Sequence, residues 1–395
     1  MSRLHISIVP TPSLISLLLV VTFCLTTSAQ APSSSQISLP SDDRVQSPGW
    51  WPTKGTAART SYVGTAECAK CHEKQALSYI QMAMSQAAAP AAYSQMLLGR
   101  NLVSADRPPY SYEIARANGT LSYSVKRDNA SLSEPLQWTF GLGHKGQTYI
   151  YQHNGAFYES RLSFYRSIDA LDLTTGHSAT TPDALDSALG RRLSADEVRR
   201  CFACHTTGSS NAGHFEPTAR VTPGVTCEAC HGPGGAHVTA MKTGKIEVGR
   251  RAILNPHHLN PIASVDFCGA CHRTWADVLQ GGFTGVINAR FQPYRLESSR
   301  CWQATKGDAR LTCTACHDPH QQLNPEPSSY DQNCLACHVA TIGDKPSQDH
   351  AGAACPIAKK DCVTCHMPQV ELPTMHATFA DHRIRIARPN EPYPN

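Results

Sequence analysis

The clearest alternation of apolar and polar positions along the chain lies between residues 110 and 164. Asn118-Gly119 and Asn154-Gly155 interrupt it, and both dipeptides favour tight hairpin turns. The alternating runs between these turns are residues 110–114, 121–125, 148–151 and 157–162. This pattern predicts a small antiparallel sheet near residues 110–165.

Two other stretches have the character of helices. Residues 73–89 are dense in Ala, Gln and Met and contain no Gly or Pro before Pro90, and a second helical stretch lies around residues 181–200. The C-terminal half has few periodic runs of Leu, Ile and Val, because Cys, His, Pro and Gly crowd them out. Something other than apolar side chains must therefore fill the interior there.

The N-terminus resembles an export signal. Arg3 precedes an apolar run over residues 14–25, and small residues follow up to Ala29. We expect residues 1–29 to be a cleaved signal peptide and residues 30–60, rich in Ser, Pro, Gln and Thr, to be a flexible leader. After cleavage no integral membrane span is expected, because the apolar run is shorter than a spanning helix and none recurs. A retained anchor is the alternative.

The charge balance adds little. The chain has 35 Lys and Arg against 31 Asp and Glu, and no run of basic residues. Nucleic acid is therefore not an expected partner.

The cysteines carry the strongest signal. Of 17 cysteines, 14 fall in seven copies of Cys-x-x-Cys-His, the attachment signature of c-type haem. The motif cysteines are Cys68 and Cys71, Cys201 and Cys204, Cys227 and Cys230, Cys268 and Cys271, Cys313 and Cys316, Cys334 and Cys337, and Cys362 and Cys365. The histidines that follow them are His72, His205, His231, His272, His317, His338 and His366.

The spacing of the motif suits haem chemistry. Two thiols three positions apart can add to the two vinyl groups of one porphyrin, and the adjacent His then reaches the iron as proximal ligand. Zinc ribbons and disulfide frameworks also use paired cysteines, but neither requires a His after each second Cys. We therefore predict seven covalently bound haem c groups. The remaining mature cysteines, Cys301 and Cys355, could form a disulfide, stay free or supply a thiolate ligand.

The motif spacing also predicts the organisation of the chain. Between Cys201 and His366 six motifs follow too closely for each haem to have its own apolar core, so the haems themselves should form the interior. We expect a multihaem cytochrome that is mostly α-helix and irregular loops around stacked haems, with the small β insert described above. The predicted regions are a first-haem segment at 61–100, a haem-free β region at 101–170 and a six-haem domain at 171–395.

Each iron needs a sixth ligand, and several residues outside the motifs could supply one. His317 and His320 are too close in sequence to bind opposite faces of one porphyrin, so His320 should bind a neighbouring haem. His237 follows His231 across a glycine-rich loop that could project it on to an adjacent haem. The other candidate ligands are His350, His376, His382 and Met84.

The chain resembles multihaem cytochromes of the cytochrome c-552/4 family. The similarity lies in YVGTAECAKCHEK, GVTCEACHGPGGAH, LTCTACHDPH, DCVTCHMPQVEL and FADHRI, and it covers nearly all of residues 62–386. The resemblance implies that His237, His320 and His382 are axial ligands. The family usually has a His about twelve residues beyond the first motif. Here Met82 and Met84 stand in that region, so the sixth ligand of the first haem is either Met84, a distant His, or absent.

Two functions follow as expectations. The first is a periplasmic electron carrier that passes electrons between redox partner proteins. The alternative is a multihaem redox enzyme, such as a reductase of nitrogen or sulfur oxyanions, in which one haem keeps an open site. Seven haems on one short chain favour the carrier, with its oligomeric state left open.

Overall fold

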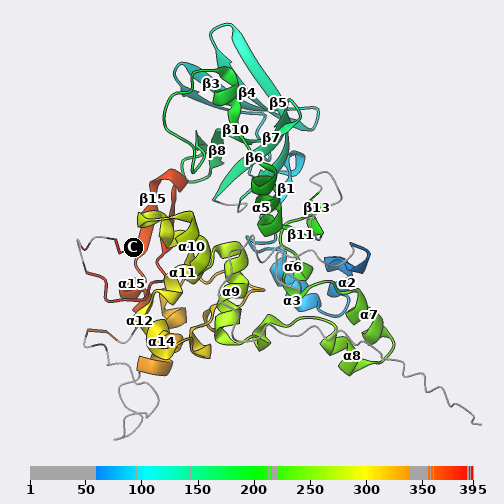
Figure 1. The fold of residues 1–395 in the computed structure, drawn as a ribbon, viewed down its shortest axis with the longest axis vertical. Helices are drawn as coiled ribbons and strands as arrows, with labels where there is room; N and C mark the ends of the chain where they lie inside the picture. The colour runs from blue at the N-terminus through cyan, green and yellow to red at the C-terminus, as the bar shows by residue number, and fades with distance from the viewer. Residues whose placement is uncertain are drawn as a thin grey trace, which may run out of the picture.

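A computed structural model describes residues 59–94, 96–141, 145–211, 214–215, 221–338 and 360–388, with single positions near residues 355–358 and 391–394. The predicted signal peptide and nearly all of the predicted leader lie outside the described residues. Figure 1 shows a β-sheet region above a larger region of short helices and loops. None of the helices in the described ranges is long and apolar enough to cross a membrane.

The sheet region spans residues 88–192 and contains a ten-stranded antiparallel sheet. Its main path runs β10-β7-β6-β5-β4-β3-β2, while β1 pairs with β5, and β8 pairs with both β6 and β9. The strands are β1 (Ala88–Pro90), β2 (Leu102–Arg107), β3 (Tyr110–Ala117), β4 (Thr120–Arg127), β5 (Ala130–Phe140), β6 (Gly146–His153), β7 (Ala156–Ser160), β8 (Leu162–Tyr165), β9 (Ala170–Leu173) and β10 (Gly190–Arg192). The two predicted hairpin turns are confirmed, because Asn118-Gly119 joins β3 to β4 and Asn154-Gly155 joins β6 to β7.

The prediction of a mostly helical protein with a small β insert is wrong. The sheet is a major part of the fold, and it recruits strands from outside residues 110–165, namely β1, β2, β9 and β10. These strands are short or polar and show little alternation of their own, so tertiary pairing rather than local pattern makes them strands. The predicted helix over residues 73–89 also ends early, because α3 covers only Glu73–Tyr79 and residues 88–90 join the sheet as β1.

The sheet region has an apolar core of its own. Tyr112, Tyr123, Tyr149 and Tyr151 are buried in one cluster together with aliphatic residues from most of the strands. A second cluster joins Phe140 and Ile150 of the sheet to the helix that follows it. Side chains alone can therefore stabilise this region.

The helical region has much smaller apolar clusters. Among the described residues, its two clusters contain three buried residues each. Most of its helices are a few turns at most: α2 (Thr65–Ala69), α3, α5 (Ala195–His205), α6 (Cys227–His231), α7 (Gly235–Lys242), α8 (Ile246–Arg251), α9 (Pro261–His272), α10 (Trp275–Gly281), α11 (Gln292–Glu297), α12 (Arg300–Thr305), α13 (Cys313–Cys316), α14 (Asp331–His338) and α15 (Cys362–His366). The helix α4 (Leu185–Leu189) belongs instead to the sheet region, where Ala188 and Leu189 are part of the apolar core.

A C-terminal hairpin connects the two regions. It consists of β15 (Gln369–Leu372) and β16 (Ala377–Ala380), and Figure 1 shows it reaching up towards β8. At its tip, the Thr374 carbonyl accepts a hydrogen bond from the Tyr165 hydroxyl at 3.3 Å, and the His376 carbonyl accepts one from the Ser167 hydroxyl at 2.8 Å. The tip of this hairpin is thus fixed to the sheet region.

Candidate functional site

Six of the seven Cys-x-x-Cys-His motifs lie on a helix or at its C-terminal end, and the first lies at the end of α2 and the residues after it. In a helical turn, residues three and four positions apart project from the same side. The two thiols and the imidazole of each motif therefore face one way. In the first motif, for example, the His72 amide donates to the Cys68 carbonyl at 2.9 Å, which is the helical pattern.

All seven motifs open into one continuous cavity of about 4650 Å³. An ordinary small-molecule site occupies roughly 300–1,000 Å³. Every one of the 14 motif cysteines and seven motif histidines lines this cavity. The residues present therefore fit a set of covalently attached haems that lie next to one another.

Three motif histidines face a second histidine across the cavity. Ring centroids are 6.4 Å apart for His72 and His237, and 6.1 Å apart for His231 and His320. The third pair is His317 with His382, whose centroids are 6.3 Å apart.

These separations suit two axial ligands of one iron. A metal lies about 2 Å from each imidazole nitrogen, and that nitrogen lies about 1 Å from the ring centroid, so two such imidazoles have centroids about 6 Å apart. A haem iron held by two His is a low-potential, coordinatively closed centre.

The hydrogen bonds of the histidines leave the correct nitrogen available. Nδ1 of His237 donates to the Gly249 carbonyl at 2.8 Å, which leaves Nε2 for a metal. The same arrangement, with a backbone carbonyl accepting from Nδ1, recurs at His205, His231, His366 and His382. Such bonds fix the ring orientation and raise the basicity of the ligating nitrogen.

The protonation state of three buried cavity histidines also suits metal binding. Burial lowers the pKa of His382 to about 4, and it lowers the pKa of His205 and His272 below the ordinary value. These imidazoles are therefore neutral near pH 7, which is the form that binds iron.

The remaining predicted ligands have different surroundings. His376 lies against the sheet, where its Nε2 is 2.6 Å from a carboxylate oxygen of Asp172, and it does not line the cavity. Met84 does line the cavity, in a turn whose backbone carbonyl accepts from Val225. His350 lies outside the described residues.

Cys301 and Cys355 are both free thiols that line the cavity, so the structure contains no disulfide between them.

Contacts between motifs define which attachment sites are neighbours. The Cys227 thiol, in the third motif, lies 3.8 Å from the Thr65 hydroxyl of α2 and contacts the Cys68 thiol of the first motif. The Cys204 thiol of the second motif lies 3.7 Å from the Ala270 carbonyl within the fourth. Further thiol contacts join Cys204 to Cys271, Cys268 to Cys313 and Cys334 to Cys362.

The fifth, sixth and seventh motifs are joined through polar side chains. The Asn333 amide donates to the Ala315 carbonyl at 2.5 Å. The Asp331 carboxylate accepts from the backbone amides of Asp361 and Cys362 at 2.8 and 2.9 Å. Adjacent motifs are thus held in fixed relative positions.

Two residues with positioning roles carry no sequence signal beyond their charge. Glu228, inside the third motif, is buried and accepts from the backbone amides of Val63, Gly64 and Gly234. Arg290 lines the cavity, and burial lowers its pKa, while one of its guanidinium nitrogens lies 3.4 Å from the Met375 sulfur. A cation in this position could hold a haem propionate.

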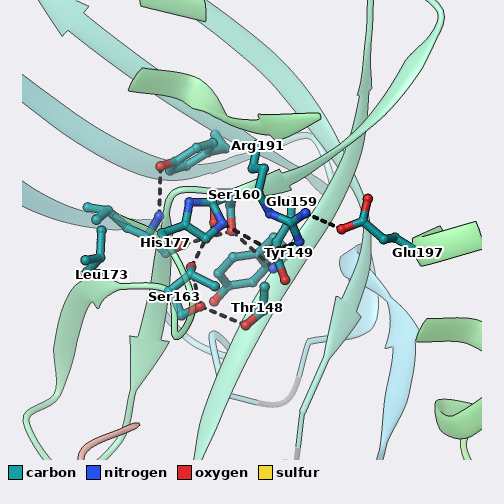
Figure 2. A network of polar contacts seen from close by, with 12 residues as sticks. Thr148, Tyr149, Glu159, Ser160, Ser163, Leu173, His177, Arg191 and Glu197 are labelled. Carbon is teal, nitrogen blue, oxygen red and sulfur yellow. Dashed lines mark hydrogen bonds and ion pairs between the residues drawn. The ribbon is translucent and has the colours of Figure 1, made fainter. Parts of the chain in front are cut away.

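A polar network fixes the second motif to the sheet (Figure 2). Arg191 bridges Glu159 of β7 and Glu197 of α5, and His177 Nε2 lies 3.0 Å from the Glu159 carboxylate. The hydrogen bonds from Ser194 and Arg191 outweigh partial burial and lower the pKa of Glu197 to about 2, so it is ionised. His177 is thus part of the network that joins the second motif to the sheet.

Comparison with known proteins supports the same chemistry. The family model for cytochrome c554 and c-prime matches residues 164–232, which include the second and third motifs. Multiheme cytochrome MtrA from Shewanella baltica (strain OS185) is 25% identical over 209 residues. That match covers 42% of this chain and 61% of the relative, so less than two thirds of the relative is spanned. No solved structure matches.

Proposed function

We propose that this chain, a multihaem c-type cytochrome, carries seven haem c groups and relays electrons between redox partner proteins in the periplasm. The observation that carries the proposal is the single cavity lined by all seven motifs, in which three pairs of histidines have the separation of axial ligands. Covalent attachment of haem c takes place after export, which together with the predicted signal peptide supports a periplasmic location.

The proximal ligands are assigned to the seven motif histidines. The sixth ligands assigned from geometry are His237 for the first haem, His320 for the third and His382 for the fifth. In each case the distal His comes from the segment after the motif two places further along the chain. Each such ligand would hold two haems close together, which suits rapid electron passage.

The motif contacts support a continuous route. The first motif adjoins the third, the fourth adjoins the fifth, and the sixth adjoins both the fifth and the seventh. Cys230 of the third motif is close enough to Cys268 and Cys271 of the fourth to raise the pKa of both thiols. The second motif contacts the fourth, so its haem is a side branch next to the sheet.

The bound haems would supply the redox chemistry, with iron cycling between the ferric and ferrous states. The chain's own cysteines would attach the porphyrins, and backbone carbonyls orient the imidazoles through hydrogen bonds from Nδ1. Three closed irons of this kind favour electron transfer over catalysis at those positions.

Intact mass and spin state of the exported protein test the proposal together. We expect the mass of the processed polypeptide plus seven haems, and low-spin signals from the first, third and fifth haems. Fewer haems, or zinc in their place, would disprove the cofactor assignment. A protein whose haems are all attached but cannot be reduced by a viologen radical would disprove the relay.

A further inference from the structure

The helical hairpin formed by α7 and α8 presents an exposed surface at the first-motif end of the haem route. Every residue from 241 to 251 except Gly249 is exposed. In Figure 1, α8 projects away from the sheet region and lies far from α14 and α15, which carry the sixth and seventh motifs. The hairpin is therefore accessible to another protein.

This end of the molecule concentrates positive charge. Residues 65–80 and 235–251 together contain six Lys and Arg against three Glu, whereas the whole 395-residue chain has a formal charge of only +4. The Glu67 carboxylate lies between Lys70 Nζ at 2.5 Å and Lys242 Nζ at 2.6 Å, which joins α2 to the hairpin. The exposed cations of the hairpin and the helix next to it are Lys70, Lys74, Lys242, Lys245, Arg250 and Arg251.

Apolar side chains are exposed among these cations. Ile246 is 43% exposed and Val248 is 55% exposed. We call Lys242, Lys245, Ile246, Val248, Arg250 and Arg251 the basic face. Apolar residues surrounded by charged ones are typical of transient protein interfaces, in which charge steers the encounter.

The hairpin is also connected directly to the first haem site. His237 lies on α7, its Nδ1 donates to the Gly249 carbonyl of α8, and its ring faces His72 across the cavity. A protein bound to the basic face would therefore lie next to the haem attached at Cys68 and Cys71. Electron transfer needs this closeness, whereas binding to a nucleic acid or to lipid headgroups does not.

We propose that the basic face is the docking surface for an acidic redox protein that exchanges electrons with the first haem. The proposal depends on the relay function and adds the chemical class of its partner. One electron passes between the partner's cofactor and the haem iron, so that one is oxidised as the other is reduced. No bond is made or broken.

Reduced flavodoxin, an acidic one-electron donor protein, serves as the probe. With the full haem-loaded protein we expect its bimolecular rate to fall as salt rises from about 0.01 M to about 0.1 M, because the Debye length falls from roughly 30 Å to 10 Å. The double variant Lys245→Glu/Arg251→Glu should react about tenfold more slowly at the lower salt concentration. Calorimetry with oxidised flavodoxin should show a matching loss of binding without turnover.

The matched control is Arg166→Glu/Arg192→Glu, which makes the same change in net charge at exposed positions of the sheet region. It should change the rate less than twofold. Lys245→Gln/Arg251→Gln removes the two charges without reversing them, so its rate with flavodoxin should lie between those of the wild type and the reversed variant. This graded loss would show that charge, and not a local folding defect, slows the reversed variant.

Three results separate the possibilities. Equal rates for the reversed variant and its control would overturn the docking surface while leaving the relay intact. Failure of every variant to accept electrons from methyl viologen radical would instead overturn the relay itself. Binding of the wild type, but not the reversed variant, to anionic phospholipid vesicles with unchanged flavodoxin rates would assign the face to a membrane and also overturn the proposal.

Discussion

Arg295 and Asp381 form a fully buried ion pair between α11 and the residue that precedes His382. Their side chains are 0% exposed, and two nitrogens of the guanidinium donate to the two carboxylate oxygens at 2.8 and 2.9 Å. Because Asp381 is adjacent in sequence to His382, this pair fixes the segment that faces His317. A positioning role for the pair leads to the first prediction.

Replacing Arg295 with Met should lower the free energy of unfolding by about 3 kcal/mol, because it leaves a buried carboxylate with fewer partners. Arg385 still contacts Asp381, so the loss should fall at the lower end of the range for buried pairs. Denaturant unfolding measures the change, and electron paramagnetic resonance should show a weakened low-spin signal from one haem. Arg250→Met, which removes an exposed pair with Glu247, is the control and should cost less than about 1 kcal/mol.

The same pair predicts a dependence of stability on pH. Burial opposes ionisation of Asp381, but the hydrogen bonds from Arg295 hold its pKa below the ordinary value. A carboxyl with a lowered folded-state pKa stabilises the fold above its unfolded pKa of about 3.9 and loses that contribution as pH falls through the folded value. The stability difference between wild type and Arg295→Met, measured in urea, should therefore shrink below about pH 4. A difference that stays constant down to pH 2 would contradict this account.

Replacing His320 with Ala should open the third haem, because His320 faces His231. We expect one new high-spin haem while all seven remain attached by mass. Removing the third haem through Cys227→Ala/Cys230→Ala should abolish this effect of His320→Ala. A new high-spin signal that persists without the third haem would show that His320 serves another iron.

The first haem distinguishes His237 from Met84. His237 faces His72 at 6.4 Å, so His237→Ala should produce a high-spin, ligand-exchangeable first haem that binds carbon monoxide when reduced. Met84→Leu should leave the spectrum and the redox titration unchanged. The reverse outcome, with a potential shift only in Met84→Leu, would assign the methionine as ligand.

The side branch at the second motif makes a kinetic prediction. A ruthenium photoreductant attached through Lys245→Cys would inject electrons near the first haem. In Cys268→Ala/Cys271→Ala, which lacks the fourth haem, the second haem and the haems beyond the fourth should be reduced in a slow phase, because the second and fifth motifs both contact the fourth. Cys201→Ala/Cys204→Ala should show no slow phase, with intact mass verifying six haems in both variants. If the variant without the second haem showed the same slow phase as the variant without the fourth, the second haem would lie on the main route.

The sequence predicted the chemistry of each motif, but not which residues distant in sequence lie next to each other in the fold. The spacing of His317 and His320 predicted that they bind different irons, but nothing local indicated that His320 would face His231. The helix predicted over residues 73–89 would have included Met84, but α3 ends at Tyr79 and residues 88–90 join the sheet. The sheet was underestimated because β2 is largely polar and β10 has only three residues, so that pairing with their neighbours makes them strands.

The unequal apolar clusters of the two regions also bear on how the protein is made. The sheet region has enough buried side chains to drive its own collapse, while the described part of the helical region has two clusters of three buried residues each. In the helical region, most of the free energy of folding then comes from the burial of the attached haems away from water. Domains that fold around a metal are stabilised in the same way. The cellular machinery that forms the thioether bonds would act on a nearly unstructured substrate, and maturation of this half would be a biosynthetic event rather than spontaneous folding.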